Sequence, residues 1–449
     1  MKILSALCTG IYVAIINIDI MREQRILRGI AVNRVQTIVM AGGAGERLQP
    51  LTRGRSKASV PFGGKYLIVD FTLSNCINSG IRQISVLTQY LTDSLHKHIQ
   101  NGWGISGSRL GDYIYCVPAQ QKVGTDWYRG TADAIRQNLD LIKGRAGDPV
   151  LILSGDHIYK MDYRQIVAYH EMKKADLTIS AVRVRVEDAA ERLGVLEEDR
   201  DHRVVGFHEK PALPKTFAES PEHVLGSMGV YVFRAGALRE VLQEPEDDFG
   251  KGVIPKAISR GRSVFVYDYE KENKIEDFVV EVKEGTRHKI LVDRTRDSSY
   301  WKDIGSIDSY YEASMDLVSV DPPFNLYGEQ WPLRAFERSL PPSKFIFGGK
   351  APDSMVSDGC IISGGTVWKS ILSPGVIVER DALVQESIVF DDVNIEPGAM
   401  IRRAIIDANV SIRSGASIGY DLQADVRKGC TVSDKGIVVI PQGMVIGLD

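Results

Sequence analysis

The chain has 449 residues and carries 55 basic against 58 acidic side chains, for a formal net charge of −3. A length of this order predicts two or three domains of roughly 150 residues each. The balance of charge argues against a nucleic-acid partner, because proteins that bind polyanions carry a basic excess or stripe. The five cysteines are scattered without a CxxC pair, which is typical of a reducing, cytoplasmic compartment.

The first 33 residues are expected to be an N-terminal extension. Residues 3–20 are mostly apolar, which leaves open a short secretory or membrane segment, an additional packed element, or a start assigned too early. No A-x-A cleavage pattern follows, and Met21 begins a polar stretch directly before the first expected strand. We therefore favour a dispensable extension and expect no membrane association.

A strand expected over residues 37–40 is followed at once by three glycines and two cations: Gly42, Gly43, Gly45, Arg47 and Lys57. Glycines permit a tight turn with unobstructed N–H groups, and the cations can neutralise a triphosphate. A dinucleotide fingerprint would need glycine where Leu48 stands, and the Gly-Lys-Ser/Thr of a P-loop is absent. On the glycines alone, a plain strand-to-helix turn is the alternative.

Strands and helix-length segments alternate between residues 34 and 320, with apolar runs at 37–40, 84–88, 150–153 and 177–182. This order predicts an α/β domain with a Rossmann-like, mostly parallel sheet covered on both faces. Ligands of such sheets collect at the carboxyl ends of the strands. Asp156 follows the third run directly, where a carboxylate could bind Mg²⁺, although a helix cap or turn is the alternative.

The joint pattern GGxGxRLxxLTxxRxK, then PFGGKY and DF, resembles the sugar-1-phosphate nucleotidyltransferases, and among them the glucose-1-phosphate adenylyltransferase family. The resemblance covers residue 34 to about 440. It implies an enzyme that transfers adenylyl from ATP to glucose 1-phosphate, giving ADP-glucose for glycogen or α-glucan synthesis, with Mg²⁺ as cofactor. A regulatory paralogue without catalysis, or a nucleotidyltransferase for another base or sugar phosphate, remains the alternative.

The resemblance also implies roles for individual residues. Arg47, Lys57 and Asp156 are expected to be catalytic, and Asp303 in YWKDIGS is expected to bind the metal together with Asp156, with His157 structural beside them. Nucleotide binding falls to the glycine loop with Arg47 and to Gln120, Gly130 and Thr131, the last two opening a helix whose amides can meet phosphate. Glucose 1-phosphate binding falls to Tyr128, Gly194, Glu209, Lys210 and Ser227.

Several positions depart from the family pattern: Ala58, Ser59, Gly252 and Ser306. In enteric-type relatives basic residues hold a sugar-bisphosphate activator. Here Gly54, Pro61 and Leu67 stand at three of those positions, and only Arg403 keeps its charge, with Arg53 and Arg55 close to Gly54. Because charge-assisted hydrogen bonds carry such binding, we expect weak activation by fructose 1,6-bisphosphate, with other small anionic effectors left open.

Residues 321–346 contain five prolines, which disfavour helix and sheet interiors and predict a linker across the surface. Beyond it, residues 347–449 repeat every 17 residues, with a turn position at Gly364, Asp381, Gly398 and Gly415. The aliphatic columns expected to face inward begin at Ile361, Val367, Ile371 and Val376.

A fixed period of short strands predicts a triangular parallel β-helix, because only stacking buries the apolar side of each coil, whereas a sandwich explains no such period. The resemblance is to hexapeptide-repeat left-handed β-helices. Acyltransferases with this repeat use a histidine base, and this chain has no histidine after His288. The repeat is therefore expected to be structural and to support a homotetramer, as in the family.

Overall fold

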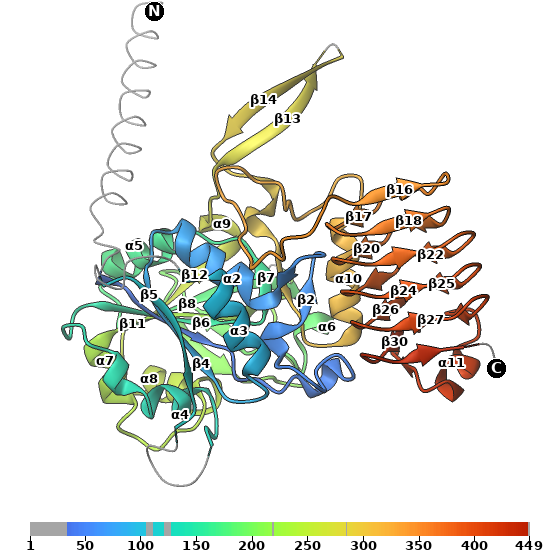
Figure 1. The fold of residues 1–449 in the computed structure, drawn as a ribbon. Coiled ribbons are helices and arrows are strands. Elements are labelled where there is room, and N and C mark those ends of the chain that lie inside the picture. The colour runs from blue at the N-terminus through green and yellow to red at the C-terminus, as the bar shows by residue number, and fades with distance from the viewer. Residues whose placement is uncertain (1–33, 105–110, 121–126, 218–219, 284, 448–449) are drawn as a thin grey trace, which may run out of the picture.

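The structure is a computed structural model, and it describes residues 34–447 except 105–110, 121–126, 218–219 and 284. The expected extension, residues 1–33, lies outside the described residues. A domain of sheet and helices is followed by a stack of short strands at the C-terminal end (Figure 1). No helix in these described ranges is long and apolar enough to cross a bilayer.

The first domain contains a nine-stranded sheet in the order β10-β9-β11-β6-β1-β4-β5, with β8 beside β11 and β12 beside β8. Strands β6, β1, β4 and β5 are parallel, which confirms the expected core of the sheet. Strand β11 runs antiparallel to β6, β8 and β9. The bounds are β1 Gln36–Met40, β4 Gln83–Thr88, β5 Tyr113–Pro118, β6 Pro149–Ser154, β8 Leu177–Arg185, β9 Val195–Glu198, β10 Val204–His208, β11 His223–Arg234 and β12 Val264–Asp268.

Both faces of this sheet are covered, because successive residues of its central strands feed opposite cores. Val39 and Leu151 belong to one buried cluster, and Ile38 and Ile152 belong to the other. The first cluster is closed by α2 (Ile68–Asn78), α3 (Asp93–Gly102) and α5 (Tyr163–Lys173), and the second by α4 (Thr131–Arg136), α7 (Ala235–Val241) and α8 (Ile254–Ser259). The remaining helices are α6 (Val186–Ala189), α9 (Tyr269–Glu272), α10 (Ile307–Leu317) and α11 (Leu422–Arg427).

Three small antiparallel pairs complete the domain. Strands β7 (His157–Tyr159) and β15 (Trp301–Asp303) form a ladder, as do β2 (Pro61–Phe62) and β3 (Tyr66–Leu67). A hairpin of β13 (Asp277–Lys283) and β14 (Thr286–Val292) projects away from the body of the domain (Figure 1).

The proline-rich segment lacks helix and strand until β16, but it is attached to the first domain. Phe324 and Trp331 are buried, and the Trp331 indole donates to Asn75 Oδ1 at 3.0 Å. The side chain of Asn78 donates to the carbonyl of Pro332 at 2.9 Å. The segment thus contributes two large apolar side chains to the domain that it leaves.

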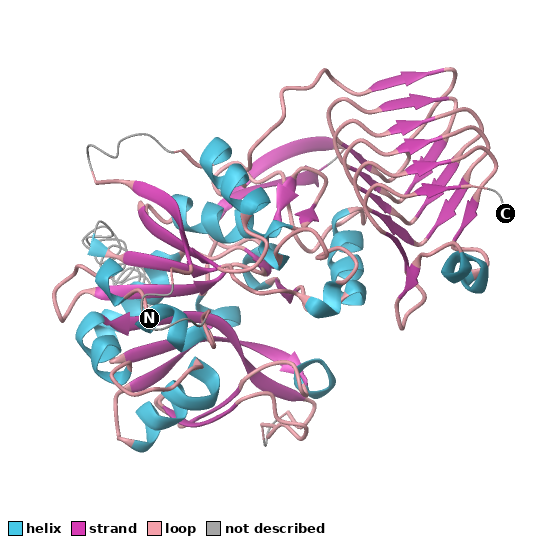
Figure 2. Ribbon diagram, turned by 60° about the horizontal axis from the view of Figure 1, so that its bottom comes forward, coloured by secondary structure: helices cyan, strands magenta, loops and turns pink. Residues whose placement is uncertain are grey.

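The C-terminal domain is a left-handed β-helix of three parallel faces (Figure 2). One face holds β16 (Lys344–Ile346), β18 (Ile361–Ser363), β21 (Ile377–Val378), β24 (Asn394–Ile395), β27 (Ser411–Ile412) and β31 (Val445–Ile446). The second holds β17 (Met355–Val356), β20 (Ile371–Leu372), β23 (Ile388–Val389), β26 (Ala404–Ile406), β30 (Val438–Ile440) and β29 (Thr431–Val432), the last antiparallel. The third holds β19 (Thr366–Trp368), β22 (Leu383–Gln385), β25 (Met400–Arg402) and β28 (Ser417–Ile418).

The structure corrects two of the expected inward columns. Ile362, not Ile361, lies opposite Val378 and is fully buried, because the first coil is one residue shorter than the repeat. The column of Ile371, Ile388 and Ile405 is buried, but outside the β-helix: it packs in one cluster with residues of the first domain. The following residues on these strands fill the interior instead: Leu372, Val389 and Ile406.

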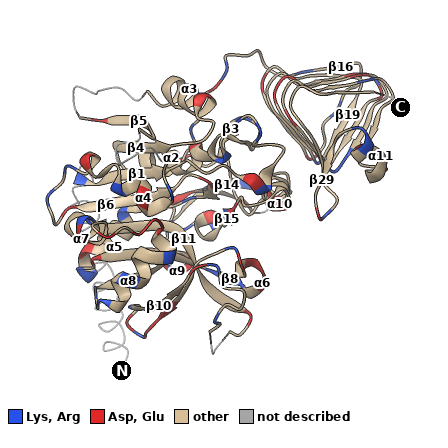
Figure 3. Ribbon diagram, turned by 90° about the horizontal axis from the view of Figure 1, so that it is seen from below, with Lys and Arg blue, Asp and Glu red and all other residues tan. Residues whose placement is uncertain are grey.

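This outward column forms the apolar contact between the two domains. It shares its cluster with Phe62 and Tyr310 of the first domain, and the Tyr310 and Phe390 rings lie 6.3 Å apart. Tyr311 Oη donates to the carbonyl of Glu386 at 2.7 Å. Lys, Arg, Asp and Glu alternate over both domains rather than collecting by sign (Figure 3).

Replacing Ile388 by Ala should destabilise the protein by about 2 to 5 kcal/mol, because the truncation leaves a cavity at a site that is 2% exposed. Met400→Ala, at a residue that is 41% exposed, is the control and should cost at most about 0.5 kcal/mol. Chemical denaturation of both variants measures the difference. Equal stabilities would contradict the docking role of the Ile388 column.

Candidate active site

The glycine loop at the carboxyl end of β1 is packed closely on its neighbours. A Cβ at Gly42 would lie 3.2 Å from Gln89 Cβ, and one at Gly45, whose φ is 66°, would lie 3.0 Å from Lys57 Cβ. At Gly43 a Cβ would meet nothing within 4 Å. The loop is therefore closed on its protein side and open at Gly43, where its backbone can approach a ligand.

Four charged or polar side chains from three distant segments meet beside this loop. The Lys57 ammonium lies 2.6 Å from Asp156 Oδ2 and 3.2 Å from Asp303 Oδ1. His157 Nε2 lies 3.4 Å from Asp156 Oδ1 and 3.6 Å from Asp303 Oδ1. Asp156 is delivered by the end of β6, and Asp303 by the end of β15, directly opposite His157 in the ladder.

The electrostatics of this cluster favour its charged forms. Burial alone would lower the pKa of Lys57, but the charges of Asp156 and Asp303 overcome burial and raise that pKa above its ordinary value. Burial would likewise raise the pKa of Asp156, yet Lys57, and after it His157, hold the pKa well below its usual range. Ser154 Oγ also donates to Asp156. Lys57 therefore stays an ammonium and Asp156 a carboxylate near neutral pH.

The same cluster has the donor set of a divalent-metal site, which is the class of cofactor that nucleotidyltransferases use. One ligand atom each of Asp156, His157 and Asp303 lies within 4.8 Å of the others. The buried Nδ1 of His157 has no hydrogen-bond partner among the described residues. Two carboxylate oxygens are ligands that suit a hard divalent cation. The residues present therefore fit such an ion.

Arg47, exposed in the turn after the loop, faces this cluster. A Cβ at Gly305 would lie 3.3 Å from Arg47 Nη2 and 2.8 Å from Asp303 Oδ2, so the guanidinium and the carboxylate flank the same glycine. The expected catalytic residues Arg47, Lys57 and Asp156 are thus brought together. Gln120, the last described residue of its segment, is exposed and has no such neighbour in the described structure.

Glu209 and Lys210 lie in a second group, arranged around two glycines. A Cβ at Gly250 would lie 2.1 Å from Glu209 Oε2, and one at Gly194 would lie 3.0 Å from the same atom. Burial raises the pKa of the Glu209 carboxyl above its ordinary value. Lys210 Nζ lies 3.7 Å from Glu209 Oε1, and the lysine side chain is half exposed, free to contact an anion.

Strand β11 connects the two groups. Ser227 N donates to the carbonyl of Gly194 at 2.8 Å, and the register of the strand shifts after Ser227. In that irregular stretch Gly229 has a φ of 65°, and a Cβ on it would lie 3.3 Å from Ser154 Cβ and 3.6 Å from His157 Cε1. The bulge thus brings the backbone after Ser227 against the carboxylate cluster.

Tyr128 is held by Gln89, which also supports the glycine loop. The backbone N–H of Tyr128 donates to Gln89 Oε1 at 2.8 Å, and Asn138 donates to Tyr128 Oη at 2.8 Å. A Cβ at Gly42 would touch the same Gln89. Tyr128 is therefore fixed at the edge of the loop rather than beside Glu209 by any contact of its own.

The expectation that amides at the start of α4 are free for phosphate is wrong. The N–H groups of Ala132 and Asp133 both donate to the carbonyl of Asp247, at 2.9 and 3.1 Å. Thr131 Oγ1 donates to Asp248 Oδ2 at 3.0 Å, and a Cβ at Gly130 would lie 2.3 Å from the Asp247 carbonyl oxygen. Gly130 and Thr131 are thus engaged in holding the segment after Asp247.

Asp248 is the residue at this site that the sequence analysis missed. Its Oδ1 accepts from the N–H groups of Gly250 and Lys251, at 2.9 and 3.1 Å, and caps the helical turn Phe249–Val253. An aspartate two residues before a glycine was the available signal. The departure at Gly252 also has a structural reason, because a Cβ there would lie 1.9 Å from Glu246 Oε2.

A cavity of about 970 Å³ lies between the domains, away from both groups, and only one of the three expected regulatory arginines lines it. That residue, Arg55, forms an ion pair with Asp407 at 2.7 Å. Arg53 is exposed and Arg403 stacks 5.8 Å over the Tyr311 ring, so neither borders the cavity. The other cations of the lining also have carboxylate partners: Lys65, Lys97 and Arg338.

Comparisons with known proteins agree with this geometry. A family model described as Nucleotidyl transferase matches residues 36–320, and one described as GlmU-like, C-terminal hexapeptide matches residues 341–440. The chain is 45% identical over 425 residues to the glucose-1-phosphate adenylyltransferase of Rhodopirellula baltica, covering 91% of this chain and 90% of the relative.

Two further relatives have the same printed name. The chain is 46% identical over 427 residues to that of Anaeromyxobacter dehalogenans, covering 92% and 98% of the two chains. It is 44% identical over 414 residues to that of Methylococcus capsulatus, covering 90% and 92%. The chain therefore belongs to the glucose-1-phosphate adenylyltransferase family of nucleotidyltransferases.

Proposed function

We propose that the chain transfers the adenylyl group of ATP to glucose 1-phosphate, giving ADP-glucose and pyrophosphate. The observation that carries the proposal is the contact of Lys57 with Asp156 and Asp303 beside the open glycine loop. A cation held by two carboxylates at the mouth of a phosphate loop suits phosphoryl chemistry, in which charge neutralisation and positioning do most of the work.

The attacking group is a phosphate oxygen of the sugar phosphate, which is already an anion, so no protein nucleophile or general base is needed. It approaches the α-phosphorus in line, and pyrophosphate leaves from the opposite side. The amides of residues 42–45 and Arg47 bind the β- and γ-phosphates. Lys57 exchanges its carboxylate partners for the phosphate being transferred, and Lys210 anchors the sugar phosphate.

Mg²⁺ is the divalent ion that we propose for Asp156 and Asp303, because it prefers carboxylate and phosphate oxygens. When bound there, it would neutralise charge on the nucleotide phosphates. His157 completes the cluster from the second shell of contacts, where histidine commonly orients carboxylate ligands. Ser227, Gly194 and Glu209 are proposed to surround the sugar.

Assembly, location and regulation belong to the same proposal. We propose a homotetramer in the cytoplasm, with the chain divided at residues 320 and 346 into catalytic domain, linker and β-helix domain. A small anionic effector in the cavity between the domains would contact Arg55. Because each cation of the lining already has a carboxylate partner, fructose 1,6-bisphosphate should bind there weakly.

A pyrophosphate-release assay with a panel of nucleoside triphosphates and sugar 1-phosphates tests the reaction. We expect ATP with glucose 1-phosphate to give the highest kcat/KM, and each substrate alone to give no release. A higher kcat/KM for another triphosphate or another sugar phosphate would contradict the assigned base or sugar. Release from no pair would favour the non-catalytic paralogue.

Lys210→Ala should raise the KM for glucose 1-phosphate much more than that for ATP, because the ammonium is proposed to bind only the sugar phosphate. The loss of one charge-assisted contact predicts a change of roughly 10- to 100-fold. Lys215→Ala is the matched control, since that lysine pairs with Glu197 on the surface. Equal effects of Lys210→Ala on both KM values would remove Lys210 from the sugar site.

A further inference from the structure

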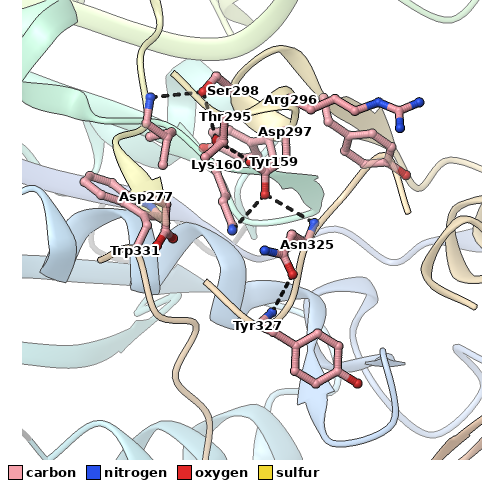
Figure 4. A network of polar contacts seen from close by, with 12 residues as sticks. Tyr159, Lys160, Asp277, Thr295, Arg296, Asp297, Ser298, Asn325, Tyr327 and Trp331 are labelled. Carbon is pink, nitrogen blue, oxygen red and sulfur yellow. Dashed lines mark hydrogen bonds and ion pairs between the residues drawn. The ribbon is translucent and has the colours of Figure 1, made fainter. Parts of the chain in front are cut away.

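A buried ion pair lies near the carboxylate cluster, and the proposed reaction does not use it. Lys160 Nζ lies 2.8 Å from Asp297 Oδ2, and the two side chains are 2% and 3% exposed. Figure 4 shows the two side chains pointing toward each other at the centre of a polar network. The pair is far more buried than the Lys57 cluster, whose side chains are 12 to 27% exposed.

The position of the pair along the chain connects it to the site. Lys160 directly follows β7, and Asp297 belongs to the short helical turn Arg296–Ser299 that leads into β15. These two strands form a ladder of three residue pairs that ends with Asp303 opposite His157. The ion pair is therefore at one end of the ladder, and the proposed metal carboxylates are at the other.

Backbone hydrogen bonds join the same two segments beside the ion pair. Tyr269 Oη donates to the carbonyls of Lys160 and Tyr300, each at 2.9 Å. The Asn273 amide donates to the carbonyls of Lys160 and Ser298, at 2.9 and 2.6 Å. The entry to the ladder is thus clamped by two side chains as well as by the charges.

The partners of each charge are specific. Asp297 accepts also from Thr295 Oγ1 and from the N–H of Asn325 at 3.2 Å, and the Lys160 ammonium lies 5.5 Å from the Phe324 ring centroid. A shift of the β7–β15 register would leave both charges buried and unpaired, which is strongly unfavourable. A shift of one residue would also turn Asp303 to the other face of the ladder.

A buried ion pair contributes little net stability compared with apolar side chains of similar size, so its value lies in the geometry that it selects. We propose that Lys160 and Asp297 are positioning residues: their ion pair fixes the register of β7 and β15 and so holds Asp156 and Asp303 together to bind a divalent cation. This inference rests on the metal site of the proposed function.

The test measures metal binding, not only turnover. Free Mn²⁺ is followed by electron paramagnetic resonance in titrations of the full-length protein with ATP present and no sugar phosphate. The test variants are Lys160→Met combined with Asp297→Leu, which removes both charges, and Asp297→Asn alone. Thermal unfolding and kcat are recorded for each.

Two comparison variants make the result specific. Asp303→Asn removes a proposed ligand. His170→Leu with Thr178→Val removes another buried polar contact, of 2.9 Å between α5 and β8, away from the ladder. The control is expected to lower the melting temperature without moving the Mn²⁺ dissociation constant.

We expect the charge-free double variant and Asp297→Asn to weaken Mn²⁺ binding by about 10- to 100-fold, as is usual when a residue that orients metal ligands is lost. The double variant should keep a melting temperature near that of the wild type. Wild-type Mn²⁺ binding in the folded double variant would overturn the positioning role. So would loss of folding in both variants, because the pair would then serve stability alone.

Asp303→Asn separates this inference from the proposed function. If Asp303→Asn loses Mn²⁺ binding while the double variant keeps it, the metal site stands and the positioning inference fails. If Asp303→Asn binds Mn²⁺ as the wild type does, the metal site itself is wrong, and the inference fails with it.

Discussion

The shared contact of Lys57 with two carboxylates is the interaction on which the rest of the site depends. Two aspartates that close together repel each other strongly in a partly buried place, unless a cation lies between them. Meeting that requirement brings together the segment after β1, the end of β6 and the end of β15. The parallel core sheet places the first two side by side, and the small ladder with β7 adds the third.

Glycines let the backbone approach this charged centre where a side chain would collide. Gly42 and Gly45 let the loop close on Gln89 and Lys57, and Gly229 lets β11 pass beside Ser154 and His157. Gly194 and Gly250 make room for the Glu209 carboxylate. These positions explain why the loop, the cluster and the proposed sugar side form one continuous surface although their residues come from distant parts of the chain.

Residues at strand ends could be predicted from the sequence, and residues whose partners lie far along the chain could not. Asp156 follows an apolar run, so its place at the sheet edge was predictable, as was the repeat that gives the β-helix. The use of the α4 amides by Asp247 was hidden, because nothing local marks a carbonyl that arrives more than a hundred residues later. The outward packing of Ile388 was hidden for a similar reason: an aliphatic residue in a short strand does not reveal which side covers it.

The turnover of Asp156→Asn tests the central claim most directly. The substitution keeps the shape of the side chain but removes the charge that Lys57 and the proposed metal both contact, so kcat at saturating Mg²⁺ and substrates should fall at least about 100-fold with the fold intact. Asp201→Asn, at an exposed aspartate in the loop between β9 and β10, should leave kcat unchanged. Turnover of Asp156→Asn close to that of the wild type would contradict the account.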